Sequence, residues 1–126
     1  MKEVIRPPGA GSSALPFSPA IRANGFVFVS GQVAQNPETG ALVGAGDIRA
    51  QTRQALSNVR RVLEAAGSGM DKLVKVTVFL TDIGEFAAMN EAYRELVPEP
   101  YPARSTVEAE LARPEFLVEI EAVALA

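Results

Sequence analysis

Arg104 is the residue whose type and position best suit recognition of a small acidic molecule. It stands two residues after Pro102, where a proline-rich stretch gives way to a strand-like segment. A guanidinium presents a planar fork of donors that matches the two oxygens of a carboxylate. From position alone, an ordinary surface arginine on an edge strand, which recognises nothing specific, is the simpler interpretation.

Glu119 and Glu121 form a second candidate, because they lie two residues apart in a strand-like segment. Side chains at that spacing point to the same face of a sheet, about 7 Å apart along the strand. The other residues on that face are apolar: Leu117, Val123 and Leu125. A carboxylate in such surroundings can have a raised pKa and exchange protons near neutral pH. The alternative is a pair of structural salt bridges.

Ser30-Gly31-Gln32 is a short run of small and polar residues at the end of an apolar strand. A glycine at such a place indicates a bulge or a close approach of the backbone. These three residues could therefore form the wall of a binding site, or they could simply end the strand. Asn90 and Tyr93 lie in a helical pattern, where packing or capping is the simpler interpretation.

The amino-acid composition limits the chemistry that this chain can perform. No cysteine or histidine occurs among the 126 residues, so a disulfide, a thiolate metal site and a Ser-His-Asp triad are excluded. Catalysis would use carboxylates, Arg, Lys, Tyr, hydroxyls, backbone groups or water. The formal net charge of -3 and the scattered basic residues argue against nucleic-acid binding. Without a signal-like N-terminus or a membrane-length apolar run, we expect a cytoplasmic protein with no membrane role.

Apolar periodicity and turn signals predict one domain spanning residues 1–126. Asn24-Gly25 predicts a hairpin turn, and Asp47 and Gly67 predict the start and stop of a helix. Either Thr81 or Asp82 can cap a second helix. The predicted strands are 20–23, 26–30, 73–80, 104–111 and 116–125, and the predicted helices are 47–66 and 83–97.

The resulting order, ββ(β)-α-β-α-ββ, is that of an α+β domain with a mixed sheet. Two helices can cover only one face of such a sheet. The segments 26–29 and 76–80 are nevertheless almost continuously apolar, which is typical of strands buried on both faces. In a chain this short, we expect a second subunit to cover the other face.

A collinear set of short motifs extends over nearly the whole chain. The motifs are Ser30–Gln32, Asn36–Gly40, Gln51–Val59, Leu63–Gly67, Val74–Phe79, Asn90–Tyr93, Pro102–Ser105 and Glu119–Ala124. Each motif is weak alone, but their order and spacing resemble the RidA/YjgF family, also called the L-PSP or reactive intermediate deaminase family.

The resemblance implies a chorismate-mutase-like α+β fold and a homotrimer with a site in each of three clefts between subunits. It implies an enzyme that hydrolyses 2-enamine and 2-imine acids, such as 2-aminoacrylate, to 2-keto acids and ammonia. The expected ligand is thus a small-molecule carboxylate. The implied chemistry requires no cofactor and no metal.

The resemblance also assigns roles to residues of this sequence. Arg104 matches the arginine that grips the substrate carboxylate, and Glu119 matches a glutamate placed near the attacking water. The remaining matches are expected to bind substrate: Phe17, Ser30, Gly31, Asn90, Ala103 and Thr106. Two of them depart from the pattern, since Phe17 replaces a tyrosine, and Thr106 stands where many members have Cys or Ser. We expect the missing hydroxyl at Phe17 to slow turnover of 2-aminoacrylate.

Two alternatives share the same cleft. One is a non-catalytic trimeric protein that binds keto acids, and the other is a specialised catabolic deaminase of the aminomuconate or pyrimidine-breakdown type. The endoribonuclease activity sometimes attached to the L-PSP name is disfavoured by the acidic charge and by the absence of histidine.

Overall fold

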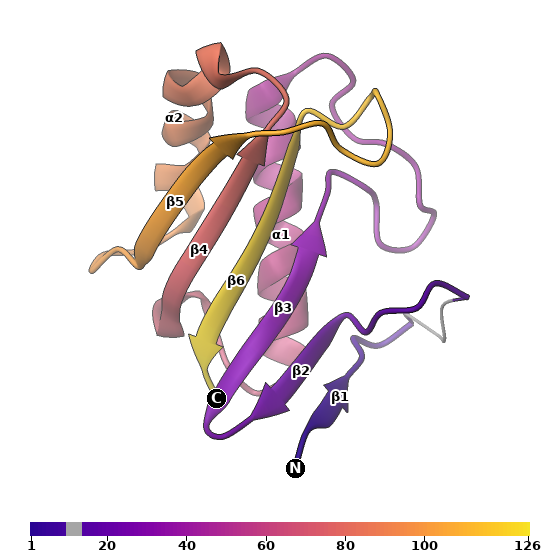
Figure 1. The fold of residues 1–126 in the computed structure, drawn as a ribbon, viewed down its shortest axis with the longest axis vertical. Coiled ribbons are helices and arrows are strands. Elements are labelled where there is room, and N and C mark those ends of the chain that lie inside the picture. The colour runs from indigo at the N-terminus through magenta and orange to yellow at the C-terminus, as the bar shows by residue number, and fades with distance from the viewer. Residues whose placement is uncertain (10–13) are drawn as a thin grey trace.

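The computed structural model describes residues 1–9 and 14–126, which form a six-stranded sheet with two helices against one face (Figure 1). The sheet order is β1-β2-β3-β6-β4-β5. The elements are β1 (Glu3–Ile5), β2 (Ala20–Ala23), β3 (Phe26–Gln32), α1 (Ile48–Ala65), β4 (Leu73–Leu80), α2 (Phe86–Leu96), β5 (Ala103–Glu108) and β6 (Val118–Leu125), with short 3-10 turns at Met70–Lys72 and Ile83–Glu85. The predicted α+β class with a mixed sheet is confirmed.

The pairing explains why the sheet is mixed. Every neighbouring pair in the order β1-β2-β3-β6-β4 is antiparallel, whereas the edge strand β5 is parallel to β4. A parallel pair needs a crossover connection, and α2 provides it. The hairpin between β2 and β3 turns at Asn24 and Gly25, whose φ angles are 51° and 81°. Two successive positive φ values are what a type I′ turn requires, so the predicted hairpin is confirmed.

The core lies between the sheet and the two helices. Val76, Val78 and Leu80 of β4 are fully buried on that side, together with Val118 and Ile120 of β6. Their neighbours in sequence alternate to the opposite face, as the two-residue repeat of a strand demands.

The face of the sheet away from the helices is open in a single chain. Phe28 is 46% exposed and Leu125 is 49% exposed, and both lie on strands in the middle of the sheet. Phe26 packs beside Phe28 with ring centroids 6.4 Å apart. Large apolar side chains are thus exposed on the sheet face that the two helices do not cover.

Several predicted boundaries were wrong by a few residues. The second helix begins as a 3-10 turn, and Asp82, not Thr81, caps it by accepting a hydrogen bond from the Gly84 amide. Strand β5 ends at Glu108, because β4 offers no partner beyond Leu80. Strand β6 starts at Val118, which pairs with Leu80 at the end of β4. Helix α1 has the predicted Asp47 cap and ends one residue early.

The N-terminal strand β1 was not assigned to its residues from the sequence. The predicted order left two or three strands before the first helix, and the structure has three. Glu3–Ile5 pairs with Ala20–Arg22 at the edge of the sheet. Only Ile5 of these three β1 residues is buried, so their alternation gives a weak signal.

The buried polar side chains of α1 fix the loops around the sheet. The Gln51 amide donates to the Gly44 and Glu115 carbonyls at 3.2 and 3.0 Å, and it accepts from the Leu117 amide at 2.9 Å. Asn58 donates to the carbonyls of residues 33 and 35, each at 2.9 Å. The loop between β3 and α1 and the loop between β5 and β6 are therefore held by one helix.

Neither α1 nor α2 combines the length and the apolar character that a membrane-crossing helix requires, over the ranges that the structure describes. In the same ranges, the acidic side chains form no cluster of three or more that is arranged to hold a metal ion.

Candidate functional site

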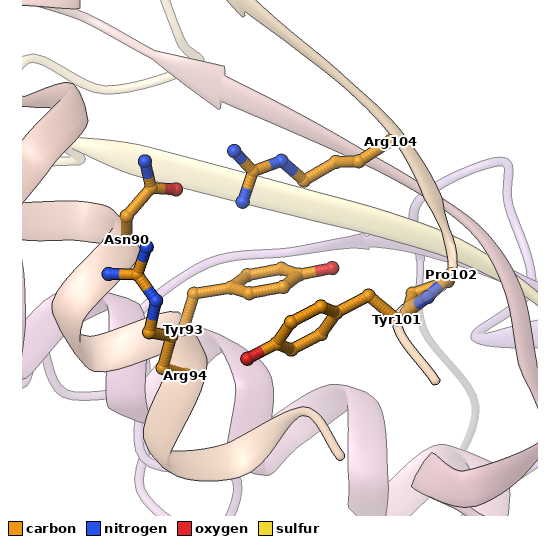
Figure 2. Close-up of a pocket in the computed structure, with 6 residues that line it drawn as sticks. All are labelled: Asn90, Tyr93, Arg94, Tyr101, Pro102 and Arg104. Carbon is orange, nitrogen blue, oxygen red and sulfur yellow. The ribbon is translucent and has the colours of Figure 1, made fainter. Parts of the chain in front are cut away.

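Arg104 lies at the start of β5, opposite Val76 of β4, and its side chain points toward α2. The guanidinium carbon is 4.7 Å from the centroid of the Tyr93 ring and 5.6 Å from that of Phe86. Cation–π stacking orients the guanidinium plane and leaves its N–H edge available. Figure 2 shows this group above the Tyr93 ring, level with the Asn90 amide.

The guanidinium borders a cavity of about 230 Å³ between α2 and the segment that leads into β5. The lining residues are Asn90, Tyr93, Arg94, Tyr101, Pro102 and Arg104. Two of them are cations and none is an acid. Arg104 forms no salt bridge with any carboxylate in the described part of the chain. The cavity thus offers an unneutralised guanidinium to an anionic ligand.

Two hydroxyl groups next to Arg104 are buried without a hydrogen-bond partner among the described residues: those of Tyr93 and Thr106. A buried donor of this kind costs free energy unless a ligand or water completes it. Burial raises the pKa of the Tyr93 hydroxyl, and the nearby Arg104 charge offsets part of that effect. Tyr93 therefore stays neutral at physiological pH and can donate a hydrogen bond.

Glu119 lies on the open face of the sheet, between the fully buried Val118 and Ile120. Burial raises the pKa of its carboxyl, and the neighbouring Glu121 charge raises it further. Gly31 is in close contact with it, because a Cβ at that position would stand 2.5 Å from the Glu119 Oε2. The pairing of β3 with β6 also shifts register between Val29 and Gln32, so the predicted bulge or close backbone approach at the glycine is confirmed.

Glu119 belongs to a second cavity, of about 710 Å³, which is bounded by the end of β3, the following loop and α1. Phe17, Ser30 and Gly31 also line it. The Ser30 hydroxyl donates to the Ser18 carbonyl at 2.5 Å and so fixes the segment that carries Phe17. The Phe17 ring itself is 57% exposed.

The predicted site residues therefore fall into two groups. Arg104 and Asn90 line the smaller cavity, and Phe17, Ser30, Gly31 and Glu119 line the larger one. The two cavities share no lining residue. Arg104 points to the helix side of the sheet and Glu119 to the open side, so a single chain does not bring them together.

Thr106 and Ala103 line neither cavity. Thr106 lies opposite Val78 on the Arg104 side of β5, and its hydroxyl is buried. Ala103 lies opposite Lys75, on the open side of the sheet.

Comparison with known proteins identifies the family. The sequence profile described as endoribonuclease L-PSP matches residues 9–126. This chain belongs to the RidA/YjgF (L-PSP) family. A RutC family protein of Pyrococcus horikoshii is 47% identical over 124 residues, which cover 98% of each chain. The mitochondrial protein mmf2 of Schizosaccharomyces pombe is 50% identical over 94 residues, 75% of this chain and 72% of that protein.

Solved structures of the family share the fold. YyfA of Yersinia pestis, described as a Rid family protein of unknown function, has a TM-score of 0.91 and 43% identity over the full length of both chains. TdcF of E. coli, solved with bound serine, has a TM-score of 0.87 and 32% identity over 98% of each chain. The fold expected from the RidA/YjgF resemblance is thereby confirmed.

Sequence reasoning missed part of both cavities. In the smaller one it did not single out Arg94 or Tyr101, although Arg94 follows Asn90 by four residues and so lies on the same helix face. In the larger one it missed Arg61 and Arg113. No local motif marks these two arginines, because Arg61 lies on α1 and Arg113 on the loop before β6, which are distant in sequence.

Proposed function

We propose that this protein hydrolyses reactive 2-enamine and 2-imine acids, such as 2-aminoacrylate, to 2-keto acids and ammonia. The observation that carries the proposal is the Arg104 guanidinium, stacked on Tyr93 and bordering a cavity without a neutralising carboxylate. That arrangement suits a ligand with a carboxylate, which all substrates of this class possess. Family membership supports the same assignment.

Each group has a defined task in the proposed reaction. Arg104 binds the carboxylate in a two-pronged manner, and the Asn90 amide lies at the same end of the cavity. An enamine first takes a proton from solvent at its terminal carbon and becomes the iminium. Water then adds to the iminium carbon, and Glu119 accepts a proton from that water. The resulting carbinolamine collapses: Glu119 returns the proton to the nitrogen, the C–N bond breaks and ammonia leaves, and the hydroxyl loses its proton to solvent as the keto group forms.

The proposed site is shared between subunits of a homotrimer. One chain holds Arg104 and Glu119 in separate cavities, so a complete site needs Arg104 from one copy and Glu119 from a neighbour. The open sheet face supplies apolar surface for such an assembly, including Phe28 and Leu125. Exposed apolar patches of this kind commonly mark protein–protein interfaces.

A complementation experiment tests function and assembly together. We expect Arg104→Ala and Glu119→Gln to be inactive alone when ammonia release from 2-aminoacrylate generated in situ is followed. Unfolded and refolded together in equal amounts, they should regain activity, because about a quarter of randomly paired interfaces then combine an intact Arg104 with an intact Glu119. Light scattering should give the mass of a trimer. A monomer, or a mixture as inactive as its components, would refute the shared site.

A second candidate, non-catalytic binding of keto acids, is favoured by Phe17. The family pattern has a tyrosine there, and Phe17 cannot supply a hydroxyl to the proton transfers. Calorimetry with 2-oxobutyrate and the ammonia assay separate the two functions. Binding without any acceleration of ammonia release would establish the binding protein.

A further inference from the structure

Arg94 places a second guanidinium at the smaller cavity. It lies on α2 four residues after Asn90, and residues at that spacing project from the same helix face. Figure 2 shows its guanidinium below the Asn90 amide, and the residue is exposed to solvent. Both arginines line the same space of about 230 Å³.

The neighbouring carboxylates of α2 do not neutralise Arg94. Glu91 pairs with Arg49 at 2.9 Å, and Glu95 pairs with Arg53 at 2.7 Å, so both are engaged by α1. Arg94 itself makes no salt bridge with any carboxylate in residues 1–9 and 14–126. The two glutamates of α2 thus form salt bridges with α1, whereas Arg94, the only cation of α2, lines the cavity without a salt bridge to any described residue.

The cavity that both arginines line also has apolar surface for a short carbon chain. The Tyr93 and Tyr101 rings and Pro102 supply apolar surface there, and the Asn90 amide is the only neutral polar side chain besides the tyrosine hydroxyls in the lining set. No lining residue is an acid, although the whole chain carries a formal net charge of -3. A ligand with one carboxylate satisfies Arg104 and leaves Arg94 to solvent.

We propose that this cavity selects 2-imino acids whose side chain ends in a second carboxylate, with Arg104 binding the first carboxylate and Arg94 the second. The proposal rests on the function proposed above and names its substrate class. Arg94 is then the specificity-determining residue. A neutral side chain leaves the exposed Arg94 guanidinium in water, so only a second carboxylate gains binding energy from it.

A substrate panel tests the proposal with the whole protein. An amino-acid oxidase generates imines in situ from aspartate and glutamate, and from alanine and leucine, while ammonia release is followed. We expect wild type to prefer the dicarboxylic imines. Arg94→Gln should lower kcat/KM for these at least about tenfold, mainly through KM, and leave the neutral imines unchanged. Arg60→Gln is the matched control, because it removes the same charge from an exposed position on α1.

Two results would overturn the proposal: a wild-type preference for neutral imines, or an equal loss on both classes in Arg94→Gln. Circular dichroism checks the fold of the variant, and Arg94→Lys, which keeps the charge, should retain most of the preference. If Arg94→Gln does not fold, the rates on dicarboxylic and neutral imines are compared in wild type and in Arg94→Lys. Both proteins should then prefer the dicarboxylic imines, and a preference for neutral imines in wild type would refute the proposal.

Binding measurements separate this proposal from the proposed function. Calorimetry compares 2-oxoglutarate with 2-oxobutyrate as product analogues, and it needs no turnover. Tighter, Arg94-dependent binding of 2-oxoglutarate without turnover of any imine would refute the deaminase and support the charge selection. Turnover of neutral imines with no dicarboxylate preference in either assay would refute the charge selection and leave the deaminase in place.

Discussion

Replacing Arg104 by lysine separates the geometry of the carboxylate clamp from its charge. The guanidinium stacks 4.7 Å from the Tyr93 centroid, which orients its two parallel donors. Lysine keeps the charge and loses the fork, so at least one charge-assisted hydrogen bond to the substrate disappears. Such a bond contributes about 1.5–3 kcal/mol. Arg104→Lys should therefore lower kcat/KM about 10- to 150-fold on any 2-imino acid.

The same substitution should leave the fold almost intact. Arg104 makes no salt bridge in the described ranges, and its stacking contributes about 0.5–1 kcal/mol at a partly exposed position. Lysine can retain part of that contact. Ammonia release from 2-aminoacrylate gives kcat/KM, and denaturant unfolding gives the stability of the same preparations. Near-normal turnover would show that Arg104 does not grip the carboxylate, and a large loss of stability would show that its role is structural.

Two further predictions concern the larger cavity. Glu119→Gln should lower kcat with little change in keto-acid affinity. Burial raises the pKa of the wild-type carboxyl. The folded protein therefore loses stability as the pH rises from the ordinary pKa of a glutamate through the raised pKa of Glu119. The Gln variant should then melt at a higher temperature than wild type at neutral pH, and melting curves that stay equally far apart in acid would contradict this. Phe17→Tyr should raise kcat on 2-aminoacrylate more than it changes KM, and equal rates would show that the hydroxyl is dispensable.

The sequence predicts the fold well because its local signals agree with one another. Asn24-Gly25 can adopt two positive φ angles cheaply, and Asp47 supplies an acceptor for the free amides at the start of α1. Such signals depend on near neighbours in the chain. Strand ends depend instead on distant partners: β5 ends where β4 ends, and β6 begins after the Leu117 amide binds the Gln51 side chain.

The candidate site was only partly predictable for the same reason. Residue type, position and the resemblance all singled out Arg104, but the rings that stack on it are Phe86 and Tyr93, which helical spacing assigns to the core. Tyr93 is indeed buried, while Phe86, beside the guanidinium, is 41% exposed. The pairing of β5 with β4, which decides the side to which Arg104 points, has no counterpart in the local sequence.

The three hydrogen bonds of Gln51 have a consequence for local motion. The loop from Ala109 to Leu117 is irregular, and such loops usually open independently of the core. Here the Glu115 carbonyl and the Leu117 amide are bound by a fully buried side chain of α1. The loop cannot move away from α1 without exposing the Gln51 side-chain amide to water. Hydrogen exchange of the loop amides should therefore be about as slow as that of α1. Arg113 and Phe116, which line the larger cavity from this loop, are therefore next to backbone that α1 holds in place.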